Sequence, residues 1–341
     1  MLGEGMALPV GILDQSPVLS GARPRDAILA TIALAKEADR LGYHRYWLAE
    51  HHAMQGLADP APEILLARIA AETSRIRIGT GGVLLPHYSA LKVAEQFRLL
   101  EALAPRRIDL GIGRAPGGSQ RVSLALESAE IQRFPRQVRD VVGFLDRTLP
   151  GDHPFAKLVA MPSGETSPEV WLLGSSDYSA ALAAELGLPF AFAHFISGDT
   201  EQVTRMYRRH FRPSPRLAEP RVLLAVAALA AETPEEAEAL AATLDLWRLR
   251  IRRGVDLPVP SRDEAHAYPH TAYDREEIAY NRRRLALGAP GAVRARIEAV
   301  ASAHQADEVM ILSITPDYDS RIRSYALLAN AFALTGSLSE V

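Results

Sequence analysis

The sequence predicts an α/β protein folded as a (β/α)8, or TIM, barrel. Eight short apolar runs, typical of buried strands, alternate with segments that have helical periodicity. The runs are continuously apolar, as expected for parallel strands that are covered on both faces. Polar residues or glycines follow most of them, at the strand end where barrels carry their chemistry. The 341 residues fit one such domain over residues 1–341.

The first half of the chain has the more regular alternation. Pro24 begins the first helix and Gly42 ends it, in keeping with the preference for proline at the start of a helix and glycine after its end. The predicted strands span residues 10–13, 46–48, 76–79 and 108–112, and the predicted helices span residues 24–41, 61–73, 90–103 and 134–149.

The second half repeats the pattern with longer interruptions. Thr233 and Pro234 predict a helix start, as N-cap and first helical residue. The predicted strands span residues 170–173, 190–195, 222–229 and 309–314, and helices are expected up to residue 186 and over 200–211, 234–253, 292–303 and 318–338. Irregular insertions are expected near 115–168 and 254–287, as loops or lids over the C-terminal face of the barrel.

An open doubly wound sheet is the main alternative fold. Its G-x-G-x-x-G fingerprint is absent, because Gly111 and Gly113 are followed by Gly117, one place late. A net charge of −3 and 6% aromatic residues argue against nucleic-acid binding. We expect no membrane span and no signal peptide, and hence a cytoplasmic protein. The absence of Cys excludes thiolate metal sites and a Cys nucleophile.

Five polar clusters are expected to meet at the mouth of the barrel. They are Asp14-Gln15-Ser16, Glu50-His51-His52, Thr80-Gly81-Gly82, Gly113-Arg114 and Gly174-Ser175-Ser176. Arg114 and serines at a helix N-terminus are typical of a phosphate site, although Ser175 or Ser176 could simply cap the helix. Gly81-Gly82 indicates either close approach of a bulky ligand or a tight strand crossing. No metal site is expected, since neighbouring His51 and His52 point to opposite sides of a strand.

These motifs resemble the bacterial luciferase-like flavin monooxygenases. The resemblance runs from about Val10 to Phe332. It is carried by Trp47–His52 (WLAEHH), Ile78–Pro86 (IGTGGVLLP), Gly111–Arg114 (GIGR) and Leu172–Ser176 (LLGSS), and the LDQSP start at Leu13–Pro17 is similar to that of single-chain oxidoreductases of the family.

The resemblance implies an FMN-dependent monooxygenase. Reduced FMN would come from a separate NAD(P)H:flavin reductase, and one oxygen atom of O2 would be inserted into a small organic substrate through a C4a-(hydro)peroxyflavin. Arg114, Ser176 and Ser179 would hold the FMN phosphate, with backbone N–H groups near Ser175. Gly81-Gly82 matches the position of a non-proline cis peptide beneath the flavin. His51 matches a histidine with an acid–base role, and a homodimer through the second and third helices is expected.

Three further residues are candidates for the substrate pocket: Asp14, Glu50 and His194. Glu50 could orient His51 or His52, with His52 the more structural of the pair, and His194 could equally be a satisfied histidine at the edge of the core. Two other functions stay open on the same fold. One is F420-dependent hydride transfer, and the other is binding of a flavin or metabolite without turnover.

Overall fold

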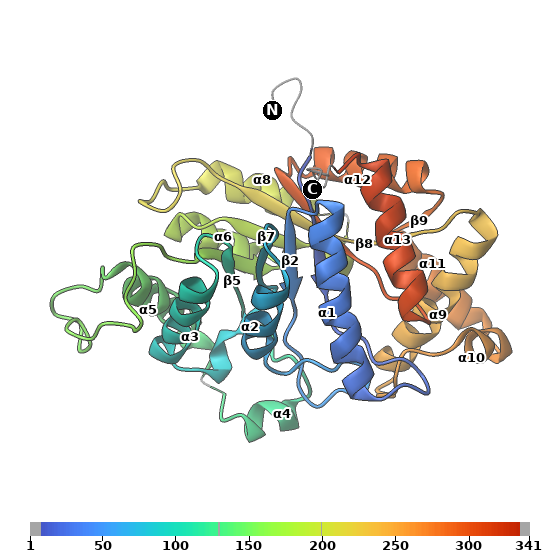
Figure 1. Ribbon diagram of the computed structural model, residues 1–341, viewed down its shortest axis with the longest axis horizontal. Helices are drawn as coiled ribbons and strands as arrows, with labels where there is room; N and C mark the ends of the chain where they lie inside the picture. Colours follow the sequence, from blue (N-terminus) through green and yellow to red (C-terminus); the bar gives the residue numbers. More distant parts are fainter. Residues whose placement is uncertain (1–7, 129, 199, 335–341) are drawn as a thin grey trace.

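A closed barrel of parallel strands forms the centre of the molecule, as predicted (Figure 1). The computed structural model describes residues 8–128, 130–198 and 200–334. The barrel strands are β1 (Val10–Asp14), β2 (Arg45–Leu48), β3 (Arg77–Thr80), β5 (Ile108–Gly113), β6 (Glu169–Gly174), β7 (Phe190–Ala193), β8 (Val222–Ala230) and β10 (Glu308–Leu312). They pair in this order, and pairing of β8 with β10 closes the ring.

Helices surround the barrel. Figure 1 shows α1, α2 and α3 side by side along the outside, with α13 next to α1. The helices are α1 (Pro24–Leu41), α2 (Pro62–Glu72), α3 (Ala90–Leu103), α4 (Gln120–Ala125), α5 (Phe134–Asp146), α6 (Asp177–Leu186), α7 (His194–Ser197), α8 (Glu201–His210), α9 (Pro234–Arg252), α10 (Arg262–Ala267), α11 (Ala272–Arg282), α12 (Pro290–Ala303) and α13 (Tyr318–Ala331), with short 3-10 turns at Leu85–His87 and Ile131–Arg133. Within the described residues, no helix combines the length and apolarity needed to cross a bilayer.

The segment 254–287 contains more regular structure than the sequence predicts. Ser261 and Thr271 form capping boxes that start α10 and α11. A short strand follows, β9 (Leu285–Gly288), which pairs with β8 on the edge that β7 occupies lower down. Residues 335–338, predicted as the end of the last helix, lie outside the described residues.

The hydrophobic core has two parts. The outer part lies between the strands and the surrounding helices, and α12 contributes Val293 and Ile297 to it. The inner part fills the barrel and continues to α9, whose Leu244 and Trp247 pack with barrel residues such as Leu229. The helix that follows β8 in sequence therefore covers the mouth of the barrel, and α12 occupies the outer layer.

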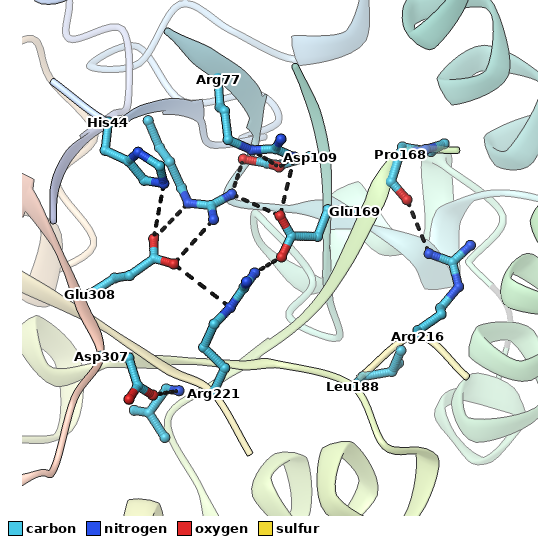
Figure 2. Close-up of polar contacts among 12 residues, drawn as sticks. His44, Arg77, Asp109, Pro168, Glu169, Leu188, Arg216, Arg221, Asp307 and Glu308 are labelled. Carbon is cyan, nitrogen blue, oxygen red and sulfur yellow. Dashed lines mark hydrogen bonds and ion pairs between the residues drawn. The ribbon is translucent and has the colours of Figure 1, made fainter. Parts of the chain in front are cut away.

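A network of buried and half-buried charges occupies the other end of the barrel, where the strands begin (Figure 2). The network comprises Arg45, Arg77, Asp109, Glu169, Arg221 and Glu308. Arg45 lies at its centre, 2.7 Å from both Asp109 Oδ2 and Glu308 Oε2. Burial alone would raise the pKa of Asp109, but the Arg45 and Arg77 guanidiniums hold it below its usual value.

Two tryptophans connect this charged floor to the interior above it. Trp47 donates its indole N–H to Asp109 Oδ2 at 2.8 Å, and its ring meets Trp171 edge-on at 5.5 Å between centroids. The guanidiniums of Arg45 and Arg221 lie over the Trp171 ring, at 5.0 and 4.4 Å. Such cation–π contacts are stronger where the cation is shielded from water. Among the described residues, charged and tryptophan side chains thus fill the barrel at the strand N-termini, and the cavity lies toward the opposite end.

Candidate active site

A cavity of about 390 Å³ opens at the C-terminal ends of the barrel strands. Its walls include segments that follow six different strands, which is where barrels assemble their functional groups. Of the residues singled out in the sequence, those that line it include Glu50, His51, Gly81, Gly82, Arg114, Ser175, Ser176 and Ser179. The structure therefore brings one site together from residues more than a hundred positions apart.

Gly81 and Gly82 are joined by a cis peptide bond, as the resemblance implies. Neither position has room for a side chain. A Cβ on Gly81 would lie 2.7 Å from Leu13 Cδ1, and one on Gly82 would lie 2.6 Å from the carbonyl oxygen of Gly111. The tight strand crossing is confirmed by these short distances to the neighbouring strands. The backbone of both glycines also lines the cavity, and close approach of a ligand to it stays a prediction.

The N-terminus of α6 forms one end of the cavity. Ser176 is its N-cap residue, yet the Ser176 side chain makes no capping hydrogen bond, so capping does not account for this serine. The Arg114 guanidinium lies 4.1 Å from the ring centroid of Tyr178, in the first turn, and makes no ion pair within the described residues. Free backbone N–H groups, the helix dipole and a cation together favour an anion at this position.

Ser179 is held at the same end by close packing. It is buried, and a Cβ on Gly174 would lie 2.3 Å from its Oγ. Only glycine at position 174 lets the end of β6 approach the first turn of α6 this closely. The glycine in the LLGSS motif therefore sets the position of the serine hydroxyl that lines the cavity.

Glu50 is oriented toward His52. Its Oε1 lies 2.6 Å from His52 Nε2 and accepts a hydrogen bond from Tyr88 Oη at 2.8 Å, and its Oε2 accepts from the Leu84 N–H at 3.0 Å. Glu50 is buried, and its carboxylate links His52 to the segment that follows the cis peptide through Leu84 and Tyr88. His52 packs edge-on against His87, consistent with its predicted structural role.

His51 differs from its neighbour in environment. Its backbone N–H donates to the Asp59 carbonyl at 3.0 Å, which fixes the loop, while its ring lines the cavity. Nδ1 is buried without a hydrogen-bond partner in the part of the chain that the structure describes. Burial lowers the pKa of His51 to about 4, and the adjacent His52 adds to the effect. The imidazole is thus neutral near pH 7 and can accept a proton.

Two candidates for the substrate pocket, Asp14 and His194, do not line this cavity. Asp14 is fully buried beside the cavity, where its carboxylate accepts from Arg321 and from the Ser16 N–H, each at 2.7 Å. Burial would raise the pKa of Asp14, but Arg321 holds it below the usual value. His194 starts α7 rather than ending β7, and its buried ring packs edge-on against His304 at 5.5 Å, outside the cavity lining.

Other residues also line the cavity. Within the predicted Asp14-Gln15-Ser16 cluster, Gln15 lines it in place of Asp14, and the alternation of adjacent residues along a strand is the signal that could have distinguished them. Phe195 and Ile196 reach it from α7. No periodicity marks these two, because α7 has a single turn. Pro116 and Ile131 come from the segment expected to form a lid.

Comparison with known proteins places the chain in a family. The family model described as luciferase-like monooxygenase matches residues 8–306. The chain belongs to the luciferase-like monooxygenases. A luciferase-like monooxygenase of Escherichia coli (strain K12) is 39% identical over 93% of this chain and 94% of its own length. The N-acetyl-S-alkylcysteine monooxygenase of Bacillus subtilis (strain 168) is 37% identical over 94% of this chain and 97% of its own length.

Several solved structures share the fold. The apo-MsnO8 crystal structure is 43% identical, with a TM-score of 0.89 over 96% of this chain and 98% of that one. The FMN complex of the oxygenating constituent of 3,6-diketocamphane monooxygenase from Pseudomonas putida is 20% identical, with a TM-score of 0.70 over 98% and 100%. An F420-dependent secondary alcohol dehydrogenase is 14% identical, with a TM-score of 0.67 over 96% and 99%. The last two likenesses concern the fold alone.

Proposed function

We propose that this luciferase-like monooxygenase binds reduced FMN and inserts one oxygen atom of O2 into a small organic substrate. The observation that carries the proposal is the two-ended cavity: an anion site at Arg114 and α6, and side-chain-free backbone at Gly81-Gly82. A phosphate fits the first end, and a flat ring system fits the second. Relatives above 30% identity named as monooxygenases support this reaction class.

The residues around the cavity have separable tasks in this proposal. When bound, reduced FMN supplies the electrons for activation of O2. Arg114, Ser176 and Ser179 hold the phosphate, and the apolar walls formed by residues such as Leu13 and Leu173 exclude water. His51 accepts or returns a proton at the cavity wall, and a negative charge beside it would raise its low pKa toward neutrality. A separate NAD(P)H:flavin reductase would deliver the reduced flavin.

FMN binding tests the phosphate site directly. Wild-type protein is titrated with FMN and with riboflavin, which lacks the phosphate, and flavin fluorescence is recorded. We expect FMN to bind about ten- to a hundredfold more tightly, since hydrogen bonds to charged groups contribute about 1.5–3 kcal/mol. Arg114→Met should remove most of this difference, whereas the exposed Arg121→Met should leave it intact. Equal binding of FMN and riboflavin would contradict the proposal.

F420 is the second candidate cofactor, because one neighbour of the same fold uses it. Parallel titrations with FMN and F420 separate the two functions, since F420 supports hydride transfer but not the oxygen chemistry. Tighter binding of F420 would replace the proposed monooxygenase with a hydride-transfer enzyme. If FMN binds and His51→Ala changes no measured rate, a binding protein without turnover is favoured.

We also propose that the chain forms a homodimer through α2 and α3. Three large apolar side chains on these helices are exposed: Ile64 by 71%, Leu99 by 54% and Leu103 by 59%. Neighbouring helices that expose such residues are suited to cover each other in a second copy. Light scattering on wild-type protein and on Ile64→Asp/Leu103→Asp should show a dimer and a monomer, respectively.

A further inference from the structure

A second chamber lies behind His51. It has a volume of about 310 Å³ and shares Gln15, His51, Phe195 and Ile196 with the proposed flavin cavity. Its remaining lining comes from the barrel mouth and from α9, including Leu244, Trp247 and Ile251. The two spaces are therefore adjacent, with the imidazole of His51 in the wall of both.

The lining of this chamber is apolar with one cation. The residues that could recognise a polar ligand are Gln15, His51 and Arg248, because the Trp247 indole N–H already donates to the Leu257 carbonyl at 3.2 Å. An apolar pocket with a few polar groups is typical of small-molecule sites. Arg248 gives this one a preference for negative charge.

No hydrogen bond or ion pair is found for the Arg248 guanidinium among the described residues, and the one carboxylate that attracts it is Asp245, one turn earlier on α9. The nearest acid in sequence, Asp245, accepts a hydrogen bond from Arg282 Nε at 2.8 Å. Arg284, a second cation that acts on Arg248, bonds Asn281 Oδ1 at 2.6 Å. Burial lowers the pKa of Arg248 to about 10, which leaves it charged at neutral pH. Because Asp245 is already paired with Arg282, a ligand carboxylate would give the half-buried Arg248 guanidinium an acceptor of its own.

We propose that this chamber is the substrate site and that the substrate is a carboxylate with an apolar chain. The carboxylate pairs with Arg248, whose planar fork suits it, and the chain lies against Leu244 and Ile251. This places the other end of the molecule toward His51. The inference rests on the proposed function, because only an enzyme would turn the bound carboxylate over as a substrate. The preference for binding a carboxylate can be measured without flavin.

The test uses hexanoate and hexanamide as probes of nearly equal size on the flavin-free protein. Binding is measured by calorimetry and by the fluorescence of Trp247 in the chamber. We expect hexanoate to bind at least about tenfold more tightly than hexanamide. Arg248→Met should abolish this preference, and Arg248→Lys should keep part of it. Arg252→Met, an exposed position on the same helix, should keep all of it.

FMN affinity and thermal unfolding are measured on the same variants. Unchanged values for Arg248→Met show that the variant is folded and that only the second chamber is affected. Equal binding of hexanoate and hexanamide to wild-type protein, or a preference that survives in Arg248→Met, overturns the inference. If FMN fails to bind while hexanoate selectivity depends on Arg248, the carboxylate site in the second chamber is supported and FMN is rejected as the cofactor.

Discussion

Glu50 Oε1 and His52 Nε2 lie 2.6 Å apart, so the buried carboxylate bonds to the second histidine of the pair and leaves the first in the cavity wall. Adjacent side chains on an extended backbone point to opposite sides. One histidine of the EHH motif therefore stabilises the loop, and its neighbour is placed to act on a ligand.

Removing the Glu50 carboxylate should destabilise the protein. Glu50→Ala leaves the Tyr88 hydroxyl, the Leu84 N–H and His52 without their acceptor, and we expect a loss of about 3 kcal/mol in the free energy of unfolding. Glu50→Gln keeps an acceptor oxygen and should lose less. Urea denaturation measures both, with the exposed Glu276→Ala as a control expected to change stability by less than about 0.5 kcal/mol. Equal stability of Glu50→Ala and the control would refute the structural role.

His51 should make stability fall as the pH is lowered. Its pKa is about 4 in the folded protein, whereas an unfolded histidine has a pKa of about 6.5. Between these values the unfolded chain binds more protons, so unfolding becomes more favourable as the pH drops from 7 to 4. The contribution is on the order of 2 kcal/mol. The free energy of unfolding is measured at pH 7 and pH 5. His51→Gln should lack the part of the pH dependence that comes from His51, whereas the exposed His266→Gln should keep it.

A methyl group at Gly82 should not be tolerated. Its Cβ would lie 2.6 Å from the Gly111 carbonyl oxygen, so the strands must move apart, which costs about 1–3 kcal/mol. Gly82→Ala should lower the melting temperature and weaken FMN binding together. Gly291→Ala is the matched control in α12: nothing lies within 4 Å, and alanine is favoured in helices. A fully stable Gly82→Ala would show that the strand crossing is looser than described.

The stability of the charged network at the strand N-termini should depend on Arg45. Arg45→Met leaves the buried carboxylates of Asp109 and Glu308 short of a cation, and breaking such pairs typically costs about 3–5 kcal/mol. The exposed pair Arg40–Glu37 provides the control, since Arg40→Met should cost at most about 1 kcal/mol.

Low pH should destabilise the protein by protonating Asp109 of the same network. Because the folded pKa of Asp109 is depressed, its contribution to stability is present above the unfolded pKa of about 4 and is lost as the pH falls through the lower folded value. Denaturation between pH 5 and pH 2 should show this loss in wild type. A reduced loss is expected in Arg45→Met, and identical acid profiles would argue against the pairing.

The order of strands and helices was predictable because buried parallel strands are written as continuous apolar runs. The position of α9 was not. Its sequence has an N-cap and proline that start any helix, and nothing in them distinguishes a helix in the outer layer from one that covers the mouth. For the same reason Arg248, which lies on α9, carries no signal in the sequence.

The positions of site residues were predictable where a motif fixes the backbone at a strand end. They were not predictable where a side chain can point either into the cavity or into the core. Gly81-Gly82 and Ser176 line the cavity because the ends of β3 and β6 must lie at the mouth. Asp14 is the last residue of β1, but its carboxylate is buried in an ion pair with Arg321, about three hundred residues away. Long-range ion pairs of this kind leave no local pattern.

The two ends of the barrel have different roles. The charged network lies at the strand N-termini, and the cavities lie at the strand C-termini. The ion pairs of Arg45 and the tryptophans above them maintain the fold at one end. Residues such as Arg248 and Ile251, contributed by α9 at the other end, take no part in that network. Substitutions at Arg248 or Ile251 can therefore alter the second chamber while the ion pairs at the other end of the barrel stay intact. Because the two groups of residues lie at opposite ends of the barrel, the chamber lining can diverge among related proteins while the charged network is kept.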